Sequence, residues 1–231
     1  MRLSHTALQL FALGGISMLL MSQPCRGSSD YGTPAEQELL PEWCRNYQII
    51  KREEDWSPVA KAQIAKFRKS GCGGFHHYTW ALIDANKAFF GDYPTEKKHF
   101  YFSEAIDNFR YVFKNSKPSC VLIPDMHAKS GDYYALMGKP KEAVESYQQA
   151  LKANPGYTPA FIGLSDLYEM QGDTEKAVSI LQAGVKANPR SNPLKKKLSR
   201  LQARISGGPD QPGSPANSEA GANPAESGEL R

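Results

Sequence analysis

Apolar residues recur every three or four positions through the second half of the chain, with charged and amide residues between them. This spacing places the apolar side chains on one face of a helix with 3.6 residues per turn. It is clearest between residues 124 and 191, where the recurring residues are Leu136, Val144, Tyr147, Leu151, Leu167, Val178 and Leu181. The pattern predicts a series of amphipathic helices that pack together through these faces.

The same stretch repeats itself with a period of 34 residues. The residues that recur at this distance are Gly138 and Gly172, Ala143 and Ala177, and Pro155 and Pro189. Glycine adopts the left-handed backbone of a tight inter-helix turn without steric cost. Alanine lets two helices cross closely, and proline prevents a helix from continuing. The period therefore predicts helical hairpins of one kind, each closed by a proline.

With this period and these residues, segments 124–157 and 158–191 each resemble a tetratricopeptide repeat. Tyr134 and Tyr168 match the family's aromatic position late in the first helix of each unit, helix A. The resemblance implies an all-α fold, a right-handed α-α superhelix of stacked hairpins. Segment 75–123 resembles a degenerate repeat, with Ala105 and Phe109 in the right relation and an insertion at its turn.

Composition divides the rest of the chain. Residues 28–74 are predicted to form an N-terminal helical extension, with helices over 36–51 and 57–70 and a glycine-rich break at the end. Residues 192–205 carry leucines on one edge and basic side chains elsewhere, as a capping helix requires. Residues 206–231 are mostly small and polar, so we expect a disordered tail.

An almost unbroken apolar run covers residues 6–21 and follows a short basic start. It is short for a bilayer span, which needs about 20 residues. Cys25 and Gly27 put small side chains at −3 and −1 of a cut after residue 27. We therefore expect residues 1–27 to be a signal peptide, and the mature protein to be periplasmic or secreted. A membrane anchor, through an uncleaved signal or a lipidated Cys25, is the alternative.

The net charge bears on the choice of partner, and the cysteine count bears on the disulfides. The net charge is +4, and cleavage would remove Arg2 and Arg26 but no acid. A balance this close to neutral gives no electrostatic reason to expect nucleic acid or an anionic membrane as the main partner. Export would also leave three cysteines, which favours one disulfide and one remaining thiol. The predicted pairing is Cys44 with Cys72, since both precede the regular repeats.

The resemblance also implies a binding surface. In this family a concave groove is lined by positions 2, 5, 9, 12 and 13 of helix A. The residues predicted to bind a partner there are Asp125, Asp132, Leu136, Ile162, Asp166, Glu169 and Met170. Acids among apolar contacts favour a basic or amphipathic segment. The alternative is that these acids only keep the surface soluble.

A second resemblance is to exported bacterial repeat proteins that carry an LPxxC segment followed by HHYCWG. This chain has LPEWC at residues 40–44 and HHYTWA at residues 76–81. Cys72 and His76 also suggest a competing hypothesis, a small metal-binding protein or enzyme. Against this hypothesis, His76 and His77 are adjacent and therefore point to different sides of a helix. The sequence also lacks the GxSxG, HExxH and P-loop patterns.

These observations favour a protein without catalytic activity or cofactor that holds other proteins. We expect a scaffold or adaptor of the bacterial cell envelope, within an assembly, secretion or polysaccharide system, whose partner is a segment of another envelope protein. Stable membrane insertion is not expected after signal cleavage. Self-association through the repeat surface is a third hypothesis.

Overall fold

The computed structural model describes residues 37–48 and 52–206, which belong to one compact unit. The predicted signal peptide and the predicted tail beyond Ser206 lie outside the described residues. Within these residues the chain is helical and contains no strand. No helix there is long and apolar enough to cross a membrane. The prediction of an all-α helical repeat fold is confirmed.

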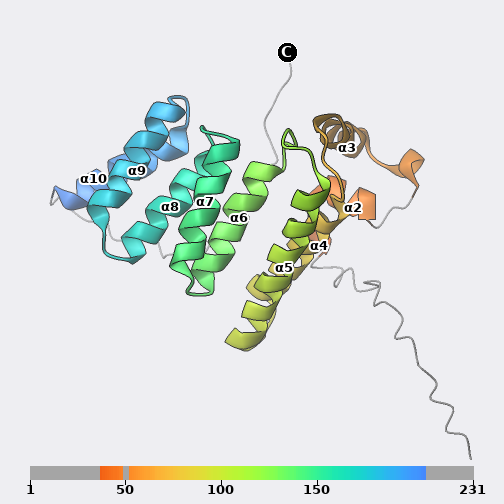
Figure 1. The fold of residues 1–231 in the computed structure, drawn as a ribbon, viewed down its shortest axis with the longest axis horizontal. Coiled ribbons are helices and arrows are strands. Elements are labelled where there is room, and N and C mark those ends of the chain that lie inside the picture. The colour runs from red at the N-terminus through yellow and green to blue at the C-terminus, as the bar shows by residue number, and fades with distance from the viewer. Residues whose placement is uncertain (1–36, 49–51, 207–231) are drawn as a thin grey trace, which may run out of the picture. The chain divides into compact units, whose positions relative to one another are not determined.

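The helices follow one another as hairpins joined by short turns (Figure 1). Their bounds are α2 Glu42–Gln48, α3 Pro58–Ser70, α4 His76–Phe90, α5 Thr95–Asn115, α6 Ile123–Leu136, α7 Pro140–Ala153, α8 Thr158–Met170, α9 Thr174–Ala187 and α10 Asn192–Ile205, with a short 3-10 turn at Glu53–Asp55. Helix α4 packs on α5, α6 on α7 and α8 on α9, while α6 also contacts α8 and α8 contacts α10. We call α4, α6, α8 and α10 the A helices, and α5, α7 and α9 the B helices.

The turns of the two regular hairpins depend on glycine. Gly138 and Gly172 have φ angles of 70° and 77°, in the left-handed region. Proline occupies the first turn of α6, α7, α8 and α10, where its missing N–H breaks no helical hydrogen bond. Asp173 caps α9 by accepting a hydrogen bond from the backbone N–H of Lys176 at 3.0 Å. Local sequence therefore sets where these helices begin and end.

Small residues allow the helices to approach one another. Ala143 and Ala177 are completely buried, as their place at a helix crossing requires. Two glycines that the sequence analysis did not single out, Gly131 and Gly163, lie against the ring of Tyr147. A Cβ atom at either would come within 2.6 Å or 2.4 Å of that ring. Tyr147 of α7 is thus held between α6 and α8, and it joins the two hairpins.

The N-terminal helices depart from the prediction in one place. The helix expected over residues 36–51 is interrupted: residues 37 and 38 are helical, the chain leaves the helix at residues 39–41, and α2 begins at Glu42. Trp43 in this short helix packs against Phe67 of α3 with ring centroids 4.7 Å apart. Its neighbour Cys44 is completely buried.

The predicted disulfide between Cys44 and Cys72 is wrong. Cys72 bonds to Cys120 instead, with the two Cα atoms 4.7 Å apart, and Cys44 is a free thiol. The reason is the α4–α5 hairpin, whose antiparallel helices return the chain after α5 to the loop before α4. Backbone contacts join the two loops, for example Lys117 N–H to Gly71 O at 2.8 Å. Burial raises the pKa of the Cys44 thiol, which keeps it protonated and inert.

Candidate protein-binding surface

The seven predicted groove residues all lie on A helices. Asp125, Asp132 and Leu136 are on α6, and the other four, Ile162, Asp166, Glu169 and Met170, are on α8. Their environments differ strongly, because the acids have partners within the chain while two apolar residues are open to solvent.

Asp125 ties three parts of the fold together. Its carboxylate accepts hydrogen bonds from the hydroxyl of Tyr78 on α4 at 2.5 Å and from that of Tyr157, before α8, at 3.0 Å. Lys129, one turn further along α6, pairs with it at 3.7 Å. A carboxylate with three partners inside the protein has little capacity left for a ligand.

Asp132 is also engaged. It accepts a hydrogen bond from the Tyr147 hydroxyl at 2.6 Å. Burial raises the pKa of this carboxyl to about 6. Asp132 therefore takes up a proton in mildly acidic solution, where an exposed aspartate would remain ionised.

The acids of α8 pair with the C-terminal helix. Lys197 of α10 lies 2.5 Å from Asp166 and 2.9 Å from Glu169. Arg204 reaches Glu169 at 3.0 Å. A simple capping helix would turn all of its basic residues to solvent, whereas two of those on α10 pair with α8. The contacts also show that this part of α8 accepts basic side chains.

Each of three successive A helices ends in an exposed apolar residue. Phe90 closes α4, Leu136 closes α6 and Met170 closes α8, with 62%, 51% and 74% of each residue exposed. Large apolar side chains left in water at the same end of successive helices are candidates for a protein interaction site. The sequence pattern predicts Leu136 and Met170 as groove residues but does not indicate Phe90. The aromatic pair FF directly before the turn at Gly91 is the signal that could have found it.

A small pocket of about 150 Å³ lies beside Phe90, between α4 and α6. The residues that line it are Ala85, Asn86, Phe89, Phe90, Lys129, Asp132 and Tyr133. We call Phe90, Leu136, Met170 and this pocket the A-helix face. It offers apolar contacts together with a carboxyl group and an ammonium group.

The structure removes one ligand from the proposed metal site. Cys72 is held in the disulfide with Cys120, so it has no thiolate to offer. His77 stacks on Tyr111 at 3.8 Å, and its Nδ1 lies 2.7 Å from Asn108 Oδ1. Over the residues that the structure describes, no three His, Cys, Asp or Glu side chains come together as they would around a metal ion. The hypothesis of a site centred on Cys72 and His76 is therefore wrong for the oxidised protein.

Comparison with known proteins finds the family in the regular repeats. Residues 134–205 match the tetratricopeptide repeat family. No curated protein matches the chain. Among solved structures, the chain is similar to one described as the first TPR of Spaghetti (RPAP3) bound to the HSP90 peptide SRMEEVD. The two share 16% identity with a TM-score of 0.39, over 56% of this chain and 98% of that chain.

Proposed function

We propose that this chain, a tetratricopeptide-repeat protein, is an adaptor without catalytic activity that holds a segment of a partner protein on its A-helix face. Tetratricopeptide repeats generally mediate protein–protein interactions, and they typically have no catalytic role of their own. The partner segment is amphipathic, with apolar side chains that bury Phe90, Leu136 and Met170. The proposed setting is the bacterial cell envelope, within an assembly, secretion or polysaccharide system.

The exposed apolar ends of α4, α6 and α8 carry this proposal. A large apolar side chain costs free energy in water, and its burial recovers roughly 25 cal/mol for each Å² of apolar surface. Three such residues on successive A helices suit an extended segment or a helix that crosses the hairpins. Their number also suits the usual pattern in which a few central residues supply most of the binding energy.

The acids that precede Met170 on α8, Asp166 and Glu169, favour basic groups in the partner. Lys197 and Arg204 already occupy Asp166 and Glu169. A partner's lysine or arginine would compete with these two for the same carboxylates.

Two features support the envelope as the setting. The apolar run at residues 6–21 has the length and flanks of an export signal. The disulfide between Cys72 and Cys120 is a bond that persists in oxidising compartments such as the periplasm.

Photo-crosslinking in the native cell tests the surface. A photoreactive amino acid replaces Met170 in one strain and Lys176, an exposed residue of α9, in a control strain. We expect one dominant crosslinked protein from position 170, identified by mass spectrometry. The double change Leu136→Glu with Phe90→Glu should abolish that crosslink without altering helical content, because both side chains are exposed. Equal crosslinking from positions 170 and 176, or a crosslink that survives the double change, would overturn the assignment.

A further inference from the structure

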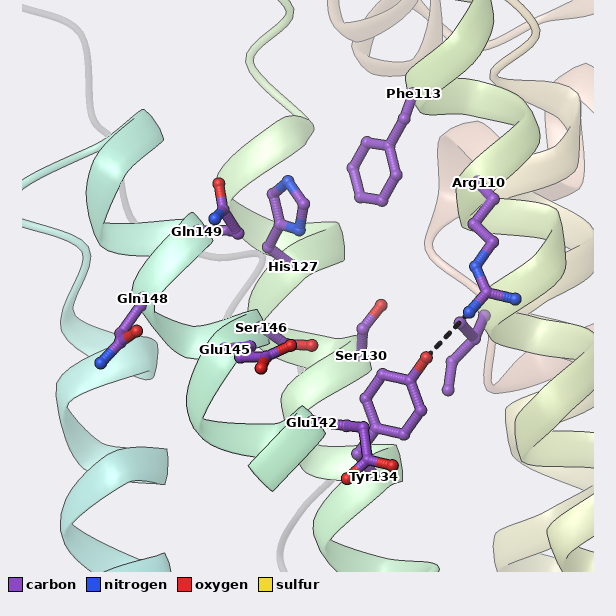
Figure 2. Close-up of a pocket in the computed structure, with 11 residues that line it drawn as sticks. Arg110, Phe113, His127, Ser130, Tyr134, Glu142, Glu145, Ser146, Gln148 and Gln149 are labelled. Atoms are coloured by element: carbon purple, nitrogen blue, oxygen red, sulfur yellow. Dashed lines mark hydrogen bonds between the residues drawn. The ribbon is translucent and has the colours of Figure 1, made fainter. Parts of the chain in front are cut away.

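A larger cleft lies on the other side of α6, between the B helices α5 and α7 (Figure 2). Its volume is about 400 Å³, within the range of about 300–1,000 Å³ for small-ligand pockets. Figure 2 shows Arg110 and Phe113 reaching in from α5, His127, Ser130 and Tyr134 from α6, and Glu142, Glu145 and Ser146 from α7. We call it the α5–α7 cleft. The proposed function does not use it.

The cleft follows the helix axes. Its lining residues on α5 are Ile106, Arg110 and Phe113, and those on α6 are His127, Ser130 and Tyr134. These residues are three or four apart, so each helix presents one continuous face. Seven residues at 1.5 Å per residue give a groove about 10 Å long, enough for two turns of a bound helix.

The floor of the cleft is hollow because α6 carries unusual residues there. His127 and Ser130 correspond, one repeat later, to Phe161 and Leu164, which are only 7% and 3% exposed. Phe161 packs in one core cluster with Leu151 and Ile180. Ile180 is the counterpart of Ser146, 34 residues earlier, and Leu151 is the counterpart of Phe113 when Ala143 is aligned with Ala105. Polar side chains thus stand in the α5–α7 cleft at positions that are filled with apolar side chains between α7 and α9.

The edge of the cleft, at Tyr134 and Glu142, is also less closed than the corresponding place one repeat later. Lys176 of α9 lies over the ring of Tyr168, 5.0 Å from its centroid. The corresponding pair is Glu142 and Tyr134, and a carboxylate is repelled by the negative face of an aromatic ring. Tyr134 instead accepts a hydrogen bond from Arg110 at 3.0 Å, drawn as the dashed line in Figure 2. Position 142 therefore supplies no cation to cover the Tyr134 ring, and this edge of the cleft stays open.

The two walls carry different charges. Glu142 and Glu145 are exposed on α7, and no ion pair is found for either in the described part of the chain. Arg110 on the facing wall is already paired with Asp107 and Tyr134. His127 stacks on Phe113 at 4.2 Å, and burial lowers the pKa of its ring, which keeps it uncharged at neutral pH. The cleft thus combines an acidic wall with an aromatic floor.

We propose that the α5–α7 cleft is a second protein-binding site, which accepts an amphipathic helix with lysine or arginine along one side. The basic side chains face Glu142 and Glu145, and an apolar side chain packs on the stacked rings of Phe113 and His127. Charge complementarity and the stacked rings of Phe113 and His127 together select this partner over an acidic peptide, which Glu142 and Glu145 would repel. With one site on the A helices and another on the B helices, the protein can hold two partners at once.

A defined peptide tests the cleft directly. The probe is a fluorescein-labelled 14-residue peptide of leucine and lysine at helical spacing, and its control has glutamate in place of every lysine. Fluorescence anisotropy should show saturable binding of the lysine peptide to the native protein and none of the glutamate peptide. Changing Glu142→Lys with Glu145→Lys should weaken binding about tenfold, the equivalent of roughly 1.4 kcal/mol.

Two further variants separate the cleft from general attraction to acids. Glu104→Lys with Glu175→Lys makes the same charge change at exposed residues of α5 and α9 outside the cleft, and it should leave affinity within about twofold. His127→Phe with Ser130→Leu fills the floor without changing any charge, and it should abolish binding. The A-helix face is also proposed to take an amphipathic basic segment, so each of these measurements is repeated in protein that carries Leu136→Glu with Met170→Glu, which disables that face. Saturable binding of the lysine peptide, and its loss when the floor is filled, should persist in this background.

Three results would overturn the proposal. One is equal weakening by both charge pairs, which would mean adhesion without a site. Another is undiminished binding by the variant with the filled floor. The third is no saturable binding by the native protein up to about 1 mM peptide, the weak end of specific association.

Discussion

The junction of α5, α6 and α7 and the junction of α7, α8 and α9 are built from corresponding positions of the same repeat. At the second junction the floor is Phe161 and Leu164, both in the core. At the first the floor is His127 and Ser130, and a cleft of about 400 Å³ opens above them. The glycine turns and crossing alanines of the α6–α7 and α8–α9 hairpins are alike, so they do not cause the difference. A few floor residues decide whether a repeat closes its surface or leaves it open for a ligand.

The same lesson applies to the acids of the A helices. Asp132 and Asp166 are one period apart. Asp132 is sheltered and bonded to Tyr147, whereas Asp166 has 53% of its side chain exposed and pairs with Lys197. Repeat position alone therefore fixes which helix face a residue occupies but not whether it can meet a partner.

The largest expected effect comes from breaking what the two junctions share. Ala143→Asp places a carboxylate at a fully buried helix crossing, where it would be unpaired. We expect a loss of more than about 4 kcal/mol, enough to unfold a domain of ordinary stability. Circular dichroism would show the loss of helix. Lys141→Asp, two residues away and exposed, should keep native helicity; native helicity in Ala143→Asp itself would contradict the packing described.

A smaller effect should follow from giving the second junction the floor of the first. Phe161→His with Leu164→Ser removes apolar volume from a packed core and introduces polar groups. Urea unfolding should show a loss of about 3–5 kcal/mol, because cavity creation and unsatisfied polar groups add together. A loss under about 1 kcal/mol would mean that these residues do not determine the packing of the junction.

The disulfide between Cys72 and Cys120 stabilises the first junction, and the described residues of the second junction contain no such bond. Replacing Cys72 and Cys120 together by serine should lower the free energy of unfolding by roughly 2–4 kcal/mol, since the bridge closes a long loop. A reductant should have the same effect on the native protein and none on the double variant. If the reductant leaves the unfolding curve of the native protein unchanged, the bridge adds no stability.

The smallest effects, of opposite sign, are expected at the two aspartates. The pKa of Asp132 is raised to about 6 in the folded protein, above the usual 3.8, so its ionisation costs stability as pH rises through this window. Asp132→Asn should therefore stabilise the protein by roughly 1–3 kcal/mol at pH 7, a gain that fades towards pH 4. Asp166→Asn removes an exposed ion pair and should cost no more than about 1 kcal/mol at pH 7. Urea unfolding at both pH values measures each, and a loss of stability in Asp132→Asn at pH 7 would contradict the assignment.

Much of the fold could be predicted because local chemistry determines it. The glycine turns, the crossing alanines and the helical periodicity each act within one hairpin, and the sequence shows them directly. The disulfide could not be read in the same way, since Cys72 and Cys120 meet only after α4 and α5 have folded against each other. Treating the α4–α5 hairpin as antiparallel would have brought its two flanking cysteines together.

The binding surfaces were harder to predict for a related reason. Asp125 looks like a free groove acid until Tyr78 and Tyr157 arrive from other segments to donate to it. The α5–α7 cleft depends on side chains of three helices, and no single stretch of sequence reveals a hollow. The one sequence signal was the pair of polar residues, His127 and Ser130, at positions where the next repeat has Phe161 and Leu164.

The central claim is that the first junction gives up packing in order to keep a binding surface. The most direct measurement is thermal unfolding of protein whose A-helix face is disabled by Leu136→Glu with Met170→Glu, with and without the further change His127→Phe with Ser130→Leu, and each with and without the lysine–leucine peptide. We expect the protein with the filled cleft to melt a few degrees higher on its own, for a gain of about 1–2 kcal/mol, and the peptide to raise the melting temperature only of the protein with the open cleft. A filled cleft that lowers the melting temperature, or a peptide that stabilises both proteins equally, would contradict this.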